Sequence, residues 1–432
     1  MEHYFSRPYA AVKPASSWWL AAAVLTAVAA MALWGLTRLK AAAPDPTLIP
    51  PPTAVALAAL PADNSKAPRH VLTADYVATK NATKVSPDVL GPWLSWASTT
   101  WQVNRSVVAA GIKTMLYTDP NRQQPRDPMF TNDESAYAHT CSGSRITSTA
   151  YENQYLTDPS SGALRDIWRR HVATRSAGAH WDAIFDDDAN DIDYATGVPC
   201  NYSPSAWLSA TKAEIESFGL PVVYNGLHLE SQMKLNDVRN VIGGMEEGCY
   251  ADSSKVPKTY DQAWEKTENI ELEMGRQHKL FFCLGRDSSD ASAALDGRLY
   301  VYASFLLAYS LPSSVLWELY DTPSRFHVQP ESKLVVMGPT PSSITAISEL
   351  KTSAGVYARE YSRCYLSGAF LGACAVVVNP DRYRAHDFPY AGKYKRTLVL
   401  SGGGIIDGGQ AAPSGPSPPS TLAPLSATIA FQ

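Results

Sequence analysis

Short apolar runs alternate with amphipathic stretches between about residues 69 and 320 of the chain. Runs of this kind, rich in Val, Ile, Tyr and Phe and bounded by turn residues, are typical of buried strands. The pattern predicts eight of them, at 70–77, 110–118, 141–148, 181–187, 220–226, 240–246, 279–285 and 313–319.

The stretches between these runs carry the signals of helices. One has Ser203 as its N-cap, Pro204 in its first turn and Gly219 beyond its end. Another begins at Asp261 as N-cap and stops at Gly275. Apolar residues spaced by three and four mark the buried faces of three helices: Leu164, Ile167, Trp168 and Val172; Ala263, Thr267, Ile270 and Met274; Leu299, Tyr302, Phe305, Leu306 and Tyr309.

Eight strands separated by helices over about 250 residues are the number and size expected of a (β/α)8 TIM barrel. A doubly wound open sheet is the alternative. Its strand–helix turns would carry a GxGxxG phosphate loop, which the sequence lacks. We therefore expect an α/β barrel.

The ends of the chain differ from its middle. Residues 17–37 contain no charge and are long enough to span a bilayer, which takes about 20 apolar residues. We expect residues 1–40 to be a cytoplasmic stub and a transmembrane signal anchor; a cleaved signal peptide ending near "AAAP" is the alternative. We expect 41–68 to be an Ala/Pro-rich tether, 69–330 the barrel and 331–432 a C-terminal β-rich region. This single-pass arrangement predicts that the barrel lies outside the cytoplasm, in the periplasm or at the cell surface.

Charge and cysteine content narrow the possible partners. A net charge of −4 gives no electrostatic reason to expect nucleic acid. The six cysteines have no paired CxxC spacing, so we expect no zinc site. In an exported protein they can form disulfides. We expect Cys364–Cys374 first, across a hairpin, then Cys141–Cys200 and Cys249–Cys283; six buried thiols are the alternative.

Acidic residues gather at the ends of the predicted strands. The segment "HWDAIFDDDANDID" (180–193) runs from a buried strand directly into five aspartates. In a TIM barrel the catalytic groups lie at the C-terminal ends of the strands, so this pattern predicts an acidic site there. The strand-end residues are Asp75, Asp119, Asp187, Glu246 or Glu247, Asp287 and Glu318, with Asn225 at the end of the fifth strand.

Three chemistries compete for the acidic run. A calcium loop of the EF-hand type fails, because Asp191 stands where that loop needs Gly and Gly197 where it needs Glu. A glycosyltransferase DxD motif fits Asp186-Asp187-Asp188, but those three letters are a weak signal. A glycosidase needs two carboxylates that flank the bond to be cleaved. Asp187 after the fourth strand and Glu247 after the sixth can supply them.

Several aromatic residues near these strand ends are candidates for stacking on sugar rings, although each is individually more typical of a core. They are Tyr194, Trp207, Tyr224, Tyr250 and Trp317.

The acidic segment also resembles a known family. "WDAIFDDDAND" is similar to the "DGVFLDN" strand of glycoside hydrolases related to the endo-α-1,4-polygalactosaminidases, with Asp182 at the leading Asp, Ala183 at the Gly and Asp187 at the strand-end Asp. "VVYNG" and "GGMEEGCY" resemble the next two barrel segments. "VYAREYSRC…GACAVVVNPD" (356–381) and "TLVLSGGGIIDGG" resemble the C-terminal β-region, so the likeness covers about 69–432.

This resemblance implies a TIM barrel, a small β-domain and action on extracellular polysaccharide. It implies Asp187 as nucleophile or base and Glu247 as acid, with Glu246 as a second candidate for that acid. The chain departs from the pattern at Ala183, and Asp186 and Asp188 crowd Asp187 with like charge, which raises the pKa of at least one of the three.

We therefore expect a membrane-tethered glycoside hydrolase that acts on a polysaccharide, an amino-sugar exopolymer being one candidate, without cofactor or metal. A non-catalytic carbohydrate-binding protein is the second hypothesis and a DxD glycosyltransferase the third. The residues expected to bind substrate are Asp75, Asp119, Asp186, Asp188, Asn225, Tyr250, Asp287 and Glu318.

Overall fold

The computed structural model describes most of the chain after residue 93 and one strand before it. All of the described residues belong to one compact unit, Ala54–Gln432. The expected anchor at 17–37 and tether at 41–68 lie outside the described residues. Within those residues, no helix has both the length and the apolar character needed to cross a bilayer. The described ranges are 73–77, 94–99, 101–148, 153–189, 199–200, 202–227, 230–251, 263–285, 295–311, 313–318, 329–337, 344–401, 410–413 and 415–432.

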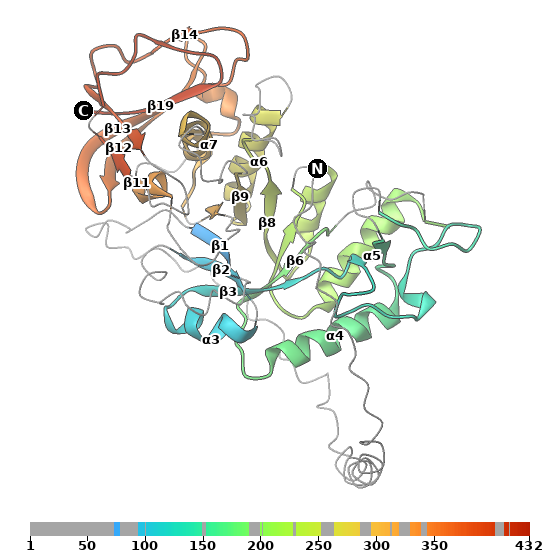
Figure 1. The fold of residues 1–432 in the computed structure, drawn as a ribbon. Coiled ribbons are helices and arrows are strands. Elements are labelled where there is room, and N and C mark those ends of the chain that lie inside the picture. The colour runs from blue at the N-terminus through green and yellow to red at the C-terminus, as the bar shows by residue number, and fades with distance from the viewer. Residues whose placement is uncertain are drawn as a thin grey trace, which may run out of the picture. The chain divides into compact units, whose positions relative to one another are not determined.

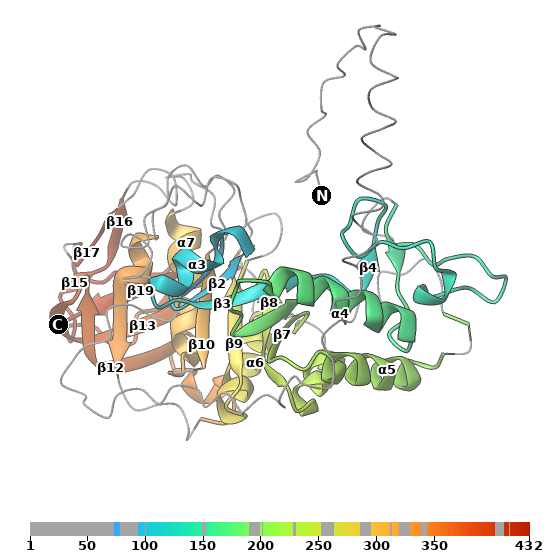
Figure 2. The same ribbon diagram turned by 90° about the horizontal axis from the view of Figure 1, so that it is seen from below.

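Eight parallel strands close into a barrel (Figures 1 and 2). Each strand pairs with the next in the order β1-β10-β9-β8-β7-β6-β3-β2, and β2 returns to β1. This closure excludes the open doubly wound sheet and makes the fold TIM-barrel-like. The strands are β1 (Thr73–Val77), β2 (Trp96–Thr99), β3 (Lys113–Thr118), β6 (Ala183–Asp186), β7 (Val222–Asn225), β8 (Val241–Glu247), β9 (Leu280–Leu284) and β10 (Ser314–Glu318).

Seven of the eight expected strands are barrel strands, and one expectation was wrong. The stretch 141–148 lies in the connection between β3 and α4, where it makes only isolated bridges such as Thr147 with Tyr155. Its alternating side chains belong to a local hairpin-like turn beside β4 (Arg122–Gln123) and β5 (Tyr155–Leu156). The missing barrel strand is β2, whose four residues are all buried and too short to show a period.

Helices follow five of the barrel strands, and 3-10 turns occupy other connections. The expected cap at Ser203 is confirmed, since its Oγ accepts from the Ala206 N–H at 3.2 Å. The structure adds a cap at Ser161, whose Oγ accepts from the Leu164 N–H at 3.2 Å. The helix expected to stop at Gly275 runs through Arg276, and Asp261 lies outside the described residues. The helices are α3 (Trp101–Ala109), α4 (Gly162–Ser176), α5 (Pro204–Ser217), α6 (Glu265–Arg276) and α7 (Leu295–Ala308), with η3 (Glu134–Ala136), η5 (Glu230–Asp237), η8 (Pro330–Lys333) and η10 (Ile347–Leu350).

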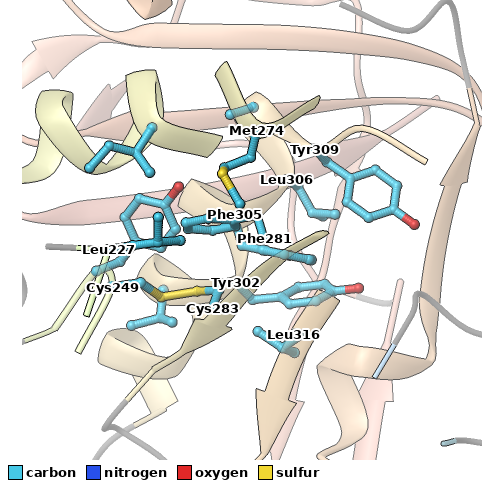
Figure 3. Packing of buried hydrophobic residues seen from close by; sticks show 14 of the residues in the cluster. Leu227, Cys249, Met274, Phe281, Cys283, Tyr302, Phe305, Leu306, Tyr309 and Leu316 are labelled. Atoms are coloured by element: carbon cyan, nitrogen blue, oxygen red, sulfur yellow. A yellow bond between two sulfur atoms is a disulfide. The ribbon is translucent and has the colours of Figure 1, made fainter. Parts of the chain in front are cut away.

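Alternate residues along each barrel strand enter two separate apolar layers. Phe185, Met245 and Trp317 belong to a cluster made almost entirely of strand residues, which fills the barrel interior. Their chain neighbours Ile184 and Leu316 belong to a larger cluster that includes residues from the helices. Figure 3 shows part of this outer layer, where Phe281, Cys283 and Leu316 meet Phe305 and Leu306 of α7.

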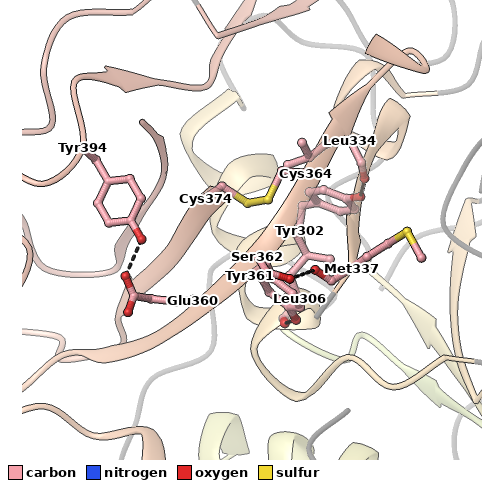
Figure 4. Close-up of a disulfide and its surroundings, with 10 residues drawn as sticks. All are labelled: Tyr302, Leu306, Leu334, Met337, Glu360, Tyr361, Ser362, Cys364, Cys374 and Tyr394. Carbon is pink, nitrogen blue, oxygen red and sulfur yellow. Dashed lines mark hydrogen bonds between the residues drawn. A yellow bond between two sulfur atoms is a disulfide. The ribbon is translucent and has the colours of Figure 1, made fainter. Parts of the chain in front are cut away.

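An antiparallel sheet follows the barrel and packs on α7. Two hydroxyls join them: Tyr302 donates to the carbonyl of Leu334 at 2.5 Å, and Tyr361 donates to the carbonyl of Leu306 (Figure 4). Because α7 lies between barrel and sheet, it is buried on nearly all sides. The five-stranded sheet has the order β11 (Leu334–Met337), β12 (Tyr357–Leu366), β13 (Ala369–Asn379), β19 (Ser426–Phe431) and β15 (Arg396–Thr397); two pairs accompany it, β14 (His386–Asp387) with β18 (Thr421–Leu422) and β16 (Val399–Ser401) with β17 (Gln410–Ala412).

All six cysteines are paired, as expected from the sequence. Cys364–Cys374 joins the β12–β13 hairpin (Figure 4). Cys249–Cys283 joins the segment after β8 to β9 (Figure 3), and Cys141–Cys200 joins the loop after β3 to the loop after β6. Two of the three disulfides therefore brace segments that follow the C-terminal ends of barrel strands.

The first prediction concerns Gly243, which packs directly on β9. A Cβ at this position would overlap the Leu280 carbonyl oxygen and lie 2.6 Å from Leu280 Cβ. We expect Gly243→Ala to lower the free energy of unfolding by about 1–3 kcal/mol through overpacking. Chemical denaturation of the full chain measures this. Gly162→Ala is the control, because a Cβ at Gly162 meets no atom within 4 Å; equal stability of the two variants would contradict the assignment of close packing.

The second prediction concerns Glu271, which α6 buries completely beside Tyr250. Tyr250 donates its hydroxyl to Glu271 Oε2 at 2.8 Å. Burial nevertheless raises the pKa of Glu271 to about 8, against partly opposing hydrogen bonds from Ser314 and Tyr250 and the charge of Arg359. A carboxyl whose pKa is higher in the folded state stabilises the fold fully only below its unfolded pKa, and this contribution is lost as the pH rises through the folded value.

We therefore expect the thermal midpoint of the wild type to fall from about pH 5 to pH 8, and Glu271→Gln to fall less over the same range. The matched control is Glu273→Gln on the same helix. Burial raises the pKa of Glu273, but hydrogen bonds from Arg276 and Gln277 outweigh this effect and lower it overall. The contribution of Glu273 to stability therefore changes with pH in the opposite direction to that of Glu271. Parallel curves for wild type and Glu271→Gln would refute the prediction.

Candidate active site

Three polar residues continue the interior face of the barrel at its C-terminal end. On β6, Phe185 faces the interior, so the side chain two positions on, Asp187, lies on that same side. By the same alternation Asn225 follows Val223 on β7, and Glu247 follows Met245 on β8. Neighbouring parallel strands bring the three together at one mouth.

The amide of Asn225 lies between the two carboxylates. Its Nδ2 donates to Asp187 Oδ1 at 2.8 Å and to Glu247 Oε2 at 3.4 Å. Asn225 is only 7% exposed, and its Oδ1 is buried with no hydrogen-bond partner. Because both carboxylates are acceptors, they fix the orientation of the amide and turn its oxygen away from themselves.

These two contacts also limit the distance between the acids. Asp187 Oδ1 and Glu247 Oε2 cannot be farther apart than the sum of 2.8 Å and 3.4 Å. Retaining glycosidases separate their carboxyl groups by about 5–5.5 Å and inverting ones by about 6.5–9.5 Å. The limit applies to this one pair of oxygens, and it places the two acids within reach of a single amide group.

Asp187 is held by three donors among the described residues. Oδ1 accepts from Asn225 Nδ2 and from the Asp188 backbone N–H at 3.1 Å, and Oδ2 accepts from the Tyr117 hydroxyl at 2.5 Å. Asp188 adopts a positive φ of 53°, so the chain turns sharply directly after Asp187. Asp187 is partly exposed and Glu247 is exposed, so both acids are open to solvent.

The backbone after Glu247 is fixed by its neighbours. Glu247 pairs with Leu284 of β9, and the carbonyl of Leu284 then accepts from the N–H groups of Gly248 at 2.8 Å and Cys249 at 3.2 Å. Gly248 has a φ of +68°, a conformation that favours glycine. The Cys249–Cys283 disulfide anchors the same turn.

Asp186 and Glu246 face the opposite side of the sheet and do not join the mouth. Asp186 is 1% exposed; Asn121 Nδ2 donates to its Oδ1 at 3.0 Å. Burial, then the charge of Asp187, raises the pKa of Asp186 against that hydrogen bond. Glu246 is 2% exposed, and its charge adds to burial in raising the pKa of Tyr224 in the outer layer. The expectations that Asp186 binds substrate and that Glu246 is an alternative acid are corrected by this alternation.

Three aromatic candidates are also core residues. Tyr250 is fully buried against Glu271, so it does not bind substrate as expected. Tyr224 donates to Asn236 Oδ1 at 3.0 Å in the outer layer, and Trp207 packs in a small cluster with Ile146 and Leu156. The sequence pattern alone could not show whether these aromatic rings pack in the core or stack on a sugar.

Trp317 does lie on the interior face of the barrel, but its ring is buried and is not accessible for stacking on a sugar. It is 4% exposed and packs against Phe185 with ring centroids 5.1 Å apart and Phe282 at 5.6 Å. Its indole N–H is buried and has no hydrogen-bond partner. Trp317 pairs with Leu284, which pairs with Glu247, so these residues share one level of the barrel.

Asp119 lies close to the pair of acids. Partial burial and the charge of Asp187 raise the pKa of Asp119, while the N–H and the charge of Arg122 oppose the shift. Asp119 Oδ1 accepts from that N–H at 3.0 Å. Asp188, also expected at the site, contributes its backbone N–H to Asp187.

The remaining candidates are not described at the level of side chains. Strand register places Asp75 beside Glu318 at the end of the β1–β10 pair. Asp287 and Tyr194 lie outside the described residues, so their roles stay predictions.

Tyr117 and Asn121 are the site residues that the sequence analysis missed. Tyr117 is the last inward residue of β3, two positions after Met115, and the alternation of "KTMLYT" carried that signal. Asn121 gives its Nδ2 to Asp186 Oδ1 and to the Asp187 carbonyl at 2.8 Å. Its place in a loop gave no periodic signal.

The donors at this mouth do not form a metal site. Within the part of the chain that the structure describes, no group of three or more His, Cys, Asp or Glu side chains is placed to hold a metal ion.

Comparisons with known proteins identify no family. No family model matches the chain, and no curated protein matches it. Among solved structures, Ega3 of Aspergillus fumigatus in complex with galactosamine is 10% identical, over 58% of this chain and 92% of Ega3, with a TM-score of 0.39. The glycoside hydrolase domain of PelA from Pseudomonas aeruginosa is 11% identical, over 57% and 94%, also with a TM-score of 0.39.

A third neighbour is the maltogenic α-amylase AmyB of Thermotoga neapolitana, 9% identical over 84% of this chain and 98% of AmyB, with a TM-score of 0.41. The descriptions of these neighbours name a galactosamine complex, a glycoside hydrolase domain and an α-amylase, and all three scores lie below 0.5. The assignment of the fold therefore rests on the strand pairing of this chain.

Proposed function

We propose that this protein is a glycoside hydrolase that cleaves a polysaccharide with Asp187 and Glu247. The observation that carries the proposal is the amide of Asn225, which contacts a carboxylate on each side at the mouth of the barrel. Two carboxylates at this spacing match what glycoside hydrolysis requires.

The roles follow from the surroundings of each acid. Asp187 accepts three hydrogen bonds, which fix the orientation of its carboxylate as a nucleophile requires. Glu247 is exposed on the other side of Asn225 and is the acid that protonates the leaving oxygen. In the proposed reaction Asp187 attacks the anomeric carbon directly and Glu247 then activates water. The product retains its configuration.

The charge of the mouth favours an amino-sugar polymer. Asp187 and Glu247 bring two carboxyl groups to one end of the barrel, and the described donors to Asp187 are all neutral. A cationic sugar such as galactosamine offsets this charge on binding, whereas an anionic polymer is repelled. The unpartnered Oδ1 of Asn225 offers an acceptor for an ammonium or hydroxyl group.

The wider arrangement remains part of the proposal. Residues 17–37 anchor the chain in a membrane and 41–68 hold the barrel outside the cytoplasm, where polymers of this kind occur. The non-catalytic carbohydrate-binding hypothesis differs in one respect: such a protein would retain sugar without cleaving it.

The third prediction separates the two glutamates. We expect Asp187→Asn and Glu247→Gln each to reduce release of reducing ends from a galactosamine polymer by about 100-fold or more, since each removes a reacting group. Glu246→Gln, one position away but on the outer face, is the matched control and should keep activity near that of the wild type. Near-ultraviolet circular dichroism of each full-length variant checks the fold.

If Glu246→Gln is as inactive as Glu247→Gln while both are folded, the assignment of the acid is wrong. If the wild type binds the polymer in pull-down assays and releases no reducing ends from any glycan of a broad panel, the carbohydrate-binding hypothesis replaces hydrolysis.

The fourth prediction concerns stereochemistry. An Asp187→Gly variant with an activated aryl glycoside should recover turnover when azide is added, and the glycosyl azide should have the configuration opposite to that of the substrate. Nuclear magnetic resonance of the products measures this. Initial release of the inverted sugar by the wild type would overturn the direct attack by Asp187.

A further inference from the structure

Among the described residues, Tyr117 is the side chain that donates a hydrogen bond to Oδ2 of the Asp187 carboxylate. It ends the inward face of β3, and its hydroxyl lies 2.5 Å from Asp187 Oδ2. Its ring stacks on Phe185, with centroids 5.9 Å apart and an interplanar angle of 25°. Tyr117 is 37% exposed, so one side of it rests on the barrel core while the other faces solvent at the mouth.

The two oxygens of Asp187 are not equivalent. Oδ1 accepts from Asn225 Nδ2 and from the Asp188 N–H, whereas Oδ2 accepts only from Tyr117 among the described residues. An acceptor oxygen of a carboxylate has two lone-pair sites. Oδ2 therefore keeps a lone pair for attack while Oδ1 has both of its sites occupied.

Acidic residues surround Asp187. Asp119 and Asp186 are coupled to it by charge, and Glu247 shares Asn225 with it. In this surrounding, a nucleophile stays ionised only if hydrogen bonds to its charged form offset the repulsion. Tyr117 and Asn225 provide such bonds from two different strands.

We propose that Tyr117 is a positioning residue that orients the Asp187 carboxylate and selects Oδ2 as the attacking atom. The inference rests on the proposed hydrolase function. In the first step Oδ2 forms a bond to the anomeric carbon while the glycosidic C–O bond breaks, and Glu247 gives its proton to the leaving oxygen. In the second step water, deprotonated by Glu247, displaces Oδ2 and releases the sugar. The Tyr117 hydroxyl keeps its proton throughout.

The test compares Tyr117→Phe with a matched control, Tyr394→Phe. Tyr394 also donates its hydroxyl to a carboxylate, that of Glu360, but in the C-terminal sheet (Figure 4). Both variants therefore lose one hydroxyl–carboxylate bond, and only one loses it at the mouth. We expect Tyr117→Phe in the full chain to lower kcat about 10-fold or more with KM changed less than about threefold, the loss being largest at acidic pH. Tyr394→Phe should leave both constants unchanged.

A second readout does not depend on turnover. A water-soluble carbodiimide modifies protonated carboxyl groups, and mass spectrometry of the Asp187 peptide gives the rate at one fixed, mildly acidic pH. We expect this rate to rise about 10-fold in Tyr117→Phe, since a hydrogen bond to the ionised form is lost. Tyr394→Phe should raise the labelling of Glu360 and leave that of Asp187 unchanged.

An increase in KM alone, with kcat and Asp187 labelling as in the wild type, would overturn the proposal and make Tyr117 a substrate contact only. If the wild type cleaves no glycan, the hydrolase function fails. The labelling rate then still decides whether Tyr117 holds Asp187.

Discussion

The alternation of side chains across the barrel wall is the constraint on which the site depends. A step of one residue moves a side chain from the interior face to the helix-facing layer. Asp186 and Asp187 are consecutive, as are Glu246 and Glu247, yet one member of each pair is buried outside the barrel and the other is at the mouth. Of these four acids, only Asp187 and Glu247 therefore lie close enough at the mouth to act on the same substrate.

The outward acids need a different physical explanation. A buried carboxylate without a cation costs several kcal/mol, and proteins avoid the cost by keeping the group protonated. Burial raises the pKa of Asp186, Glu214, Glu268 and Glu271, all of which face the layer between strands and helices. These groups are polar parts of the packing, whereas Asp187 and Glu247 at the mouth are open to solvent.

Much of this arrangement could be predicted from the sequence. Long apolar runs identified seven barrel strands, and capping residues identified α5, because both signals are local. All three disulfides were expected from the spacing of six cysteines in an exported chain. β2 was missed because four buried residues show no period, and 141–148 was wrong because a local turn also alternates. The choice between Glu246 and Glu247 needed the register of β8, and the contact from Tyr117 to Asp187 needed two strands that lie far apart in sequence.

The Cys249–Cys283 disulfide has a consequence for the biogenesis of the protein. It lies two residues beyond Glu247 and closes onto β9, 34 residues farther along the chain. During synthesis the turn that carries Glu247 therefore cannot be locked until β9 has emerged and an oxidising compartment has been reached. A copy of the chain that folds in a reducing environment would lack this covalent link between the turn after β8 and β9.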